Sequence, residues 1–227
     1  MERLAMFISI DGADCTGKST LASGLYDRLT QEGHKVKVLH FPRYETPLGA
    51  LIKEYLTGKE KIDVTAIQHL YLADQLDYTG FCLQEDLKNY DYVICDRYEH
   101  SNLVYYSVTE KIRSISEGYS ADERIKAFSE LQQGICMTDV QLILYLDDPV
   151  LLERLAQKSD RDLFEVNGNF MRIINKTFAD IRIVGPDGAE AQPINVTDLT
   201  PEELVEKALK LIQKKKEDYE KWLTSSM

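Results

Sequence analysis

Cysteine is scarce in this sequence, and its spacing excludes the commonest zinc sites. Four cysteines occur in 227 residues, and no two of them have the CxxC spacing of a metal-binding pair. Cys95 ends an apolar run and is expected in the core, which argues against a disulfide there. We therefore expect free thiols and a location in the reducing cytoplasm. The four are Cys15, Cys82, Cys95 and Cys136.

Long apolar runs are also missing. The chain enters an apolar, strand-like run at residues 4–10 without the extended apolar core of a signal peptide. No other stretch is long enough to cross a bilayer. We therefore expect no membrane partner.

Positive charge is in deficit. Lysine and arginine number 27 against 38 aspartates and glutamates, so the formal net charge is −11. Sequence-independent binding to nucleic acid or to an anionic membrane needs clustered lysine and arginine, and this composition argues against it. A local basic pocket can still bind an anionic ligand, because the field inside a cleft depends on the residues that line it.

Short apolar runs alternate with amphipathic segments along the chain. This alternation predicts an α/β fold with a parallel five-stranded sheet flanked by helices on both faces. Strands are predicted at residues 4–10, 36–41, 92–95, 141–146 and 193–196, and helices at 20–30, 46–56, 64–87, 99–109, 121–133, 151–158, 170–183 and 200–223.

No linker divides the chain, so we expect a single domain over residues 1–227. Glycine and proline mark a turn at residues 185–188. Residues 159–167 are strongly charged, and we expect a small mobile lid at about 154–167.

The first apolar run leads into a glycine-rich loop with the spacing G-x-x-x-x-G-K-S. Its glycines allow a tight turn in which successive N–H groups point at phosphate oxygens. Lys18 is expected to reach the β- and γ-phosphates of ATP, and the Ser19 hydroxyl to bind Mg²⁺. The fold expected is thus a three-layer sandwich of the phosphate-loop NTPase type. The predicted ATP-binding residues are Gly12, Ala13, Asp14, Cys15, Thr16, Gly17, Lys18, Ser19 and Thr20.

A second candidate site follows the third predicted strand. Asp96 ends this strand, and a carboxylate in that place of a phosphate-loop protein holds Mg²⁺ or its water. A solvated aspartate at a strand end is the simpler alternative. Arg97 follows at the carboxyl edge of the sheet, where an arginine can grip a second phosphate with two hydrogen bonds.

These motifs together resemble those of thymidylate kinases. The resemblance covers essentially the whole chain, with the same order of phosphate loop, acceptor site and lid. It rests on Asp14 within the loop, on Phe41-Pro42-Arg43-Tyr44, and on Asp96-Arg97-Tyr98-x-x-Ser101-Asn102-x-x-Tyr105.

The resemblance implies a kinase that transfers the γ-phosphate of ATP to dTMP in dTTP biosynthesis, with Mg²⁺ and usually as a homodimer. It places the acceptor nucleotide against residues along several elements. Arg43 is an open case, because a surface arginine explains it equally well. The implied acceptor contacts are Asp14, Phe41, Pro42, Arg43, Tyr71, Gln75, Arg97, Ser101, Asn102 and Tyr105.

The sequence departs from the family pattern in two places. Gln75 stands where the family has an arginine that reads the base, which leaves open a kinase of altered or broader base choice. Cys15 stands where some members carry a catalytic arginine in the loop. The resemblance then implies an arginine from the lid, with Arg161 as first choice and Arg154 as second.

A phosphate-loop switch or binding module is the remaining alternative. Guanine-binding switches typically carry N-K-x-D after a late strand, and the segment Ile194-Asn195-Val196-Thr197-Asp198 lacks it.

Overall fold

The computed structural model describes residues 5–184, 190–191 and 193–225. Five parallel strands form its main sheet in the order β2-β3-β1-β4-β7. This confirms the predicted sheet and fold class. The strands are β1 (Met6–Gly12), β2 (Val36–His40), β3 (Tyr92–Asp96), β4 (Val140–Tyr145) and β7 (Ile194–Asn195).

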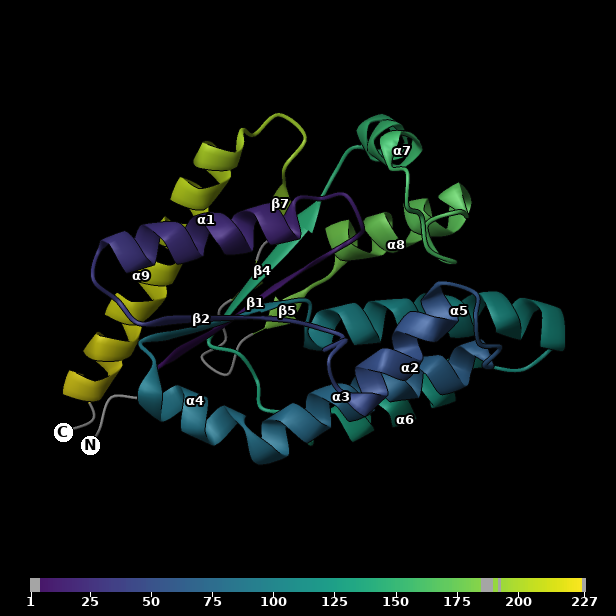
Figure 1. Ribbon diagram of the computed structural model, residues 1–227, viewed down its shortest axis with the longest axis horizontal. Coiled ribbons are helices and arrows are strands. Elements are labelled where there is room, and N and C mark those ends of the chain that lie inside the picture. Colours follow the sequence, from purple (N-terminus) through teal and green to yellow (C-terminus); the bar gives the residue numbers. More distant parts are fainter. Residues whose placement is uncertain (1–4, 185–189, 192, 226–227) are drawn as a thin grey trace.

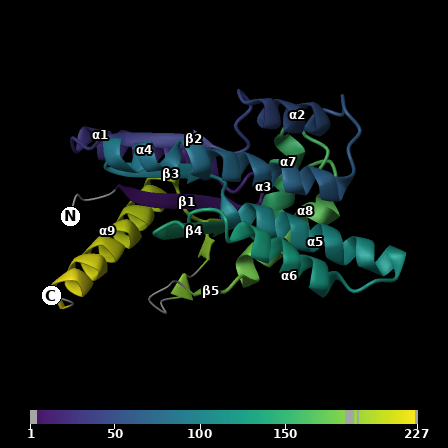
Figure 2. The ribbon, with the colours of Figure 1, turned by 90° about the horizontal axis from the view of Figure 1, so that it is seen from below.

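Helices cover both faces of this sheet (Figure 1). The described helices are α1 (Lys18–Gln31), α2 (Pro47–Leu56), α3 (Val64–Phe81), α4 (Leu83–Asn89), α5 (Glu99–Glu117), α6 (Ala121–Gln132), α7 (Asp148–Gln157), α8 (Gly168–Asp180) and α9 (Pro201–Ser225). Figure 2 shows α2, α3 and α5 to α8 at one end of the molecule, and both termini at the other.

Side chains that alternate between the two faces of the sheet form two hydrophobic cores, one on each face. Ile8 and Ile10 of β1 belong to the core on the face of α1 and α9, whereas Phe7 belongs to the core beneath α3, α4 and α6. Val93 follows the same rule in β3 and lies with Phe7. Successive strand residues point to opposite faces, and both faces of a parallel sheet are buried, so both sets are apolar.

Two of the helices that cover the sheet differ from the prediction in extent or continuity, and the helix predicted at 170–183 ends early at Asp180. Residues 64–87 form two helices, because the chain bends at Cys82 and Leu83 and Leu87 turn into the sheet core. Helix α5 runs beyond residue 109 because the buried Glu110 accepts hydrogen bonds from Thr65 and Tyr119. Hydrophobic periodicity does not register such polar contacts.

A two-stranded antiparallel pair, β5 (Ile183–Val184) and β6 (Glu190–Ala191), was not predicted. The helix predicted at 170–183 ends at Asp180, and residue 183 belongs to β5 instead. The turn predicted at 185–188 lies outside the described residues. Within residues 5–184 and 193–225, no helix is both long and apolar enough to span a bilayer.

Candidate active site

The glycine-rich loop connects β1 to α1 at the carboxyl end of the sheet. Gly12 has a φ of 151°, and a Cβ there would lie 2.4 Å from the Leu144 carbonyl oxygen, so only glycine fits. Gly17 has a φ of 88° and caps α1. Lys18 Nζ donates to the Ala13 carbonyl at 2.6 Å. The loop thus places a lysine and a helix N-terminus on one concave turn, which suits a phosphate chain.

Lys18 lies in an unusual electrostatic setting. Burial removes its ammonium group from water, and Arg97 repels it, so its pKa falls to about 8 despite the attraction of Asp14 and Asp96. Bound phosphates would add negative charge beside Lys18 and favour its charged form.

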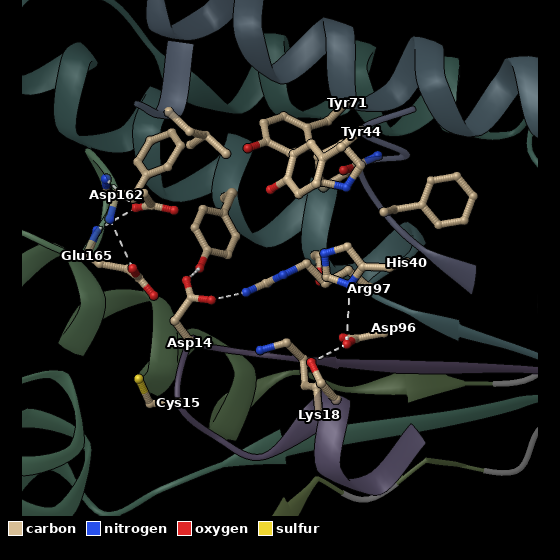
Figure 3. Close-up of a pocket in the computed structure, with 18 of the residues that line it drawn as sticks. Asp14, Cys15, Lys18, His40, Tyr44, Tyr71, Asp96, Arg97, Asp162 and Glu165 are labelled. Carbon is tan, nitrogen blue, oxygen red and sulfur yellow. Dashed lines mark hydrogen bonds and ion pairs between the residues drawn. The ribbon is translucent and has the colours of Figure 1, made fainter. Parts of the chain in front are cut away.

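The residues predicted to hold Mg²⁺ meet beside the loop (Figure 3). Ser19 Oγ donates to Asp96 Oδ2 at 2.5 Å, and His40 Nδ1 lies 3.3 Å from the same oxygen. Burial acts to raise the pKa of Asp96, but the His40 contact and the charge of Lys18 outweigh it and bring the value to about 2. Its Oδ1 is buried without a hydrogen-bond partner. An ionised carboxylate with an orphan oxygen next to a serine hydroxyl fits Mg²⁺.

Asp14 and Arg97 form an ion pair at the centre of the cavity (Figure 3). Tyr105 Oη donates to the second oxygen of Asp14 at 2.9 Å. Burial alone would raise the pKa of Asp14, yet the charges of Arg97 and Lys18 lower it. Arg97 adopts a φ of 69°, which is rare for a side chain of its size and turns its guanidinium toward the loop.

The opposite wall carries flat and amide side chains. Gln75 Oε1 accepts a hydrogen bond from Asn102 Nδ2 at 2.8 Å, and both residues are buried. Tyr71 and Pro42 line the same cavity, which has a volume of about 400 Å³. Phe41 also lines it, although its ring packs on Tyr78 and Tyr98. This wall offers an aromatic face and amide hydrogen-bonding groups, which suits a nucleobase.

Comparison with known proteins assigns the family. The family model described as Thymidylate kinase matches residues 10–182. The chain belongs to the thymidylate kinase family. It is 29% identical over 204 residues to the thymidylate kinase of Deinococcus radiodurans, covering 88% of this chain and 92% of that protein. It is 28% identical over 174 residues to a probable thymidylate kinase of Methanocaldococcus jannaschii, covering 75% and 79%.

A solved structure agrees. The thymidylate kinase of Candida albicans, whose report describes broad substrate specificity, aligns with a TM-score of 0.76 at 25% identity, over 94% of this chain and 93% of that one. The chain is therefore an enzyme of the nucleoside monophosphate kinase class, and the family is ATP-dependent.

Most residues predicted for this thymidylate kinase site line one cavity. Gly12, Ala13 and Thr16 belong to the phosphate loop but do not line the cavity. The predicted residues that line it are Asp14, Cys15, Gly17, Lys18, Ser19, Thr20, Phe41, Pro42, Tyr71, Gln75, Asp96, Arg97, Ser101, Asn102 and Tyr105.

Arg43 lies outside this lining. Its guanidinium donates to Asp74 Oδ1 at 2.9 Å and to Asp77 Oδ2 at 2.6 Å, and the residue is 7% exposed. The structure therefore gives it a local role, joining the segment after β2 to α3. Ser101 reaches the cavity, but its hydroxyl donates to Asp11.

The two lid arginines are placed differently. Arg154 on α7 donates to the Cys15 carbonyl at 3.1 Å and so touches the phosphate loop. Arg161, the first choice from the sequence, is exposed, and neither arginine lines the cavity. Lys158 reaches the cavity instead and pairs with Glu165 at 2.5 Å.

Eight lining residues were not among the predicted site residues: His40, Tyr44, Leu56, Gln68, Lys158, Asp162, Phe164 and Glu165. A signal was available for two of them. His40 ends β2 at the same sheet edge as Asp96, and parallel strands end side by side. Gln68 lies three and seven residues before Tyr71 and Gln75, which places all three on one face of α3.

Proposed function

We propose that this thymidylate kinase transfers the γ-phosphate of ATP to dTMP, giving dTDP and ADP for dTTP biosynthesis. One observation carries the proposal. The loop with Lys18 and the guanidinium of Arg97 border one cavity, with Asp14 between them. Two cationic sites joined in this way fit two phosphate groups that must approach each other.

The acceptor needs little activation. The second pKa of a phosphate monoester is near ~6, so dTMP is largely ionised at neutral pH. The barrier comes instead from repulsion between two anions and from their alignment. Lys18 and Arg97 would offset the repulsion. Asp14 would exchange its Arg97 contact for one with the acceptor as the phosphate binds.

Ser19 and Asp96 would hold Mg²⁺, and their donor set supports this assignment. When bound, the ion supplies positive charge to the ATP phosphates. His40 would keep Asp96 ionised and oriented.

Some family members have a catalytic arginine where this chain has Cys15. In this chain the corresponding positive charge would come from an arginine in the segment 154–167. Its contact with the loop favours Arg154 over Arg161. We expect Arg154→Ala to lower kcat by about 10³-fold, in line with other arginines that stabilise phosphoryl transfer, and Arg161→Ala to change kcat less than about threefold. A large loss for Arg161→Ala with little for Arg154→Ala would restore the opposite assignment.

The reaction is tested by coupled ADP release with dTMP, dUMP, dCMP, dGMP and dAMP as acceptors. Highest kcat/KM with dTMP is expected. No stimulation by dTMP above the other four would contradict the proposal.

A kinase of broader base choice is the second candidate. Gln75 carries no charge where the family pattern has arginine, and its amide pairs with Asn102. The Candida albicans relative supports the idea, because its report ascribes broad substrate specificity to it. Gln75→Arg should raise the preference for dTMP over the other monophosphates, whereas Gln133→Arg on the exposed surface should leave it unchanged. Equal preference in both variants would remove Gln75 as the reader of the base.

We also infer a homodimer in the cytoplasm. Phe81 at the end of α3 is 82% exposed, and so large an apolar side chain in water supports a surface that a second chain covers. The four free thiols support a reducing compartment. Sedimentation equilibrium would give the mass of one chain if the dimer is wrong.

A further inference from the structure

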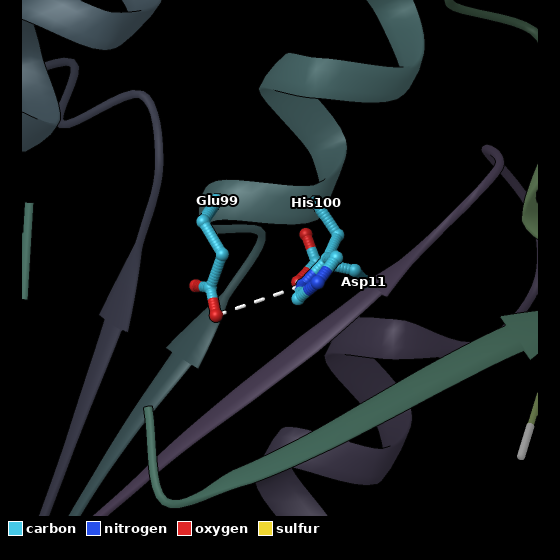
Figure 4. A group of neighbouring side chains, drawn as sticks. All are labelled: Asp11, Glu99 and His100. Carbon is cyan, nitrogen blue, oxygen red and sulfur yellow. Dashed lines mark ion pairs between the residues drawn. The ribbon is translucent and has the colours of Figure 1, made fainter. Parts of the chain in front are cut away.

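Three metal-ligating side chains meet behind the phosphate loop (Figure 4). Asp11 is the last residue of β1 before Gly12, and Glu99 and His100 open α5. One ligand atom from each lies within 4.8 Å of the others. All three residues are buried, with exposed fractions of 0%, 5% and 7%. The cluster borders the acceptor site through Ser101, whose hydroxyl donates to Asp11, but none of its three members lines the cavity.

Each member has an atom without a hydrogen-bond partner. Asp11 Oδ1 accepts from the Tyr98 and Ser101 N–H groups, but its Oδ2 has no partner. Glu99 Oε1 accepts from the Thr138 hydroxyl, and its Oε2 has none. His100 Nδ1 is also unpartnered. Orphaned buried polar atoms are costly, and one such atom on each of three neighbouring side chains suggests a missing ligand.

The charge of the cluster points the same way. Asp11 and Glu99 are two carboxylates, and within the described part of the chain neither forms an ion pair with a lysine or an arginine. The neighbouring Ser9 and Thr138 contribute neutral hydroxyls. His100 is the basic group that faces both carboxylates, and a protonated imidazole offsets only one of their two negative charges, so a doubly charged cation would stabilise the cluster further.

We propose that Asp11, Glu99 and His100 form a binding site for a divalent transition metal, with Zn²⁺ as the best match. The His100 Nδ1 atom lies 3.6 Å from Glu99 Oε1 and 3.8 Å from Asp11 Oδ2. Tetrahedral zinc with nitrogen and oxygen ligands separates its ligand atoms by about 3.3–3.6 Å. The three ligand atoms now lie within 4.8 Å of one another, so the side chains would have to move closer together around the ion, with Glu99 turning its unpartnered Oε2 toward it.

The donor set separates this site from the one at Ser19 and Asp96. An imidazole nitrogen favours zinc over Mg²⁺ or Ca²⁺, which prefer all-oxygen sites. The metal would tie β1 to the first turn of α5, directly behind Gly12 and Arg97. Its effect would therefore be on stability and on the placement of both phosphate sites.

Protons compete for the same atoms. Burial raises the pKa of Glu99 to about 7, and the neighbouring Asp11 adds to this. The contacts with Asp11 and Glu99 raise the pKa of His100 despite its burial. Zinc and protons therefore compete for these atoms, because metal ligands must lose their protons.

The test uses the chelator-treated, full-length chain without nucleotide and in excess Mg²⁺. Zn²⁺ is titrated by calorimetry and its effect on Tm is measured. We expect one equivalent to bind and Tm to rise. Glu99→Gln and His100→Gln should each weaken binding by about a hundredfold or more, because even outer-shell partners cost about 10–100-fold.

Two controls locate the ion. His34→Gln removes a half-buried histidine near Asp91, outside the cluster, and should leave zinc binding unchanged. His40→Gln removes the histidine beside Asp96 and should also leave it unchanged if the ion sits at Asp11. Absence of zinc binding by the wild-type chain, or equal binding by all four variants, would overturn the proposal in favour of a proton-sharing cluster.

Wild-type crystals grown with Zn²⁺ give a readout that does not depend on folding of the variants. An anomalous peak among Asp11, Glu99 and His100 is expected. A peak only at another position, or no peak, would refute the site.

Discussion

Arg97 is the sharpest point at which to test the acceptor site. Its side chain is 16% exposed, pairs with Asp14 and donates to the Gly12 carbonyl at 3.3 Å. We expect Arg97→Ala to raise the KM for dTMP and to leave the KM for ATP within about threefold. Alanine at this position keeps the φ of 69°, and both residues carry a Cβ, so the backbone strain changes little.

The size of the effect follows from the contacts that a phosphate would make. Two charge-assisted hydrogen bonds at about 1.5 kcal/mol each amount to about 3 kcal/mol, or roughly 150-fold in kcat/KM. The phosphate must first displace Asp14 from Arg97, which offsets part of that gain. We therefore expect a loss of about 30–150-fold. Arg97→Lys keeps the positive charge but lacks the planar guanidinium, so its kcat/KM for dTMP should fall between those of the wild type and Arg97→Ala.

The assay is coupled ADP release with each substrate varied in turn, together with a thermal melt of every variant. Arg172→Ala is the matched control, because Arg172 pairs with Asp148 on the surface. A double-mutant cycle with Asp14→Asn measures how strongly the two side chains compete with the substrate. A KM for dTMP that changes less than threefold in Arg97→Ala, in a chain that melts normally, would refute the assignment.

Three further predictions follow from the geometry of the site. Gly12→Ala should lower the free energy of unfolding by about 2–5 kcal/mol in urea denaturation, since its φ is 151° and its Cβ would meet the Leu144 carbonyl; wild-type stability would contradict this. Asp96→Asn should raise the Mg²⁺ concentration that gives the half-maximal rate tenfold or more. Each tenfold rise corresponds to a loss of about 1.4 kcal/mol of Mg²⁺-binding free energy. An unchanged Mg²⁺ dependence would remove Asp96 from the metal site. Burial and the neighbouring Asp14 raise the pKa of Asp162 from 3.8 to about 6, so the folded state holds this proton more tightly and loses stability as the pH rises through 6. Asp162→Asn should therefore be about 1–2 kcal/mol more stable than wild type at pH 8 and equal to it near pH 4; equal stability at both would refute the shift.

The sequence by itself determined the sheet and the core of the site. Alternating apolar residues specify which face each strand residue joins, and a parallel sheet brings its carboxyl ends to one edge. Ser19 and Asp96 are 77 residues apart in the chain, yet this rule places them together. The glycine spacing fixed the loop, because Gly12 and Gly17 need backbone angles that other residues rarely adopt.

Only the tertiary structure decided which partners the long polar side chains take. Arg43 pairs with Asp74 across 31 residues, and Arg154 rather than Arg161 reaches the loop across 139 residues. Such choices depend on ångström differences between competing acceptors, and hydrophobic periodicity does not encode them. The same holds for Asp11, Glu99 and His100, whose convergence depends on how the first turn of α5 packs on β1.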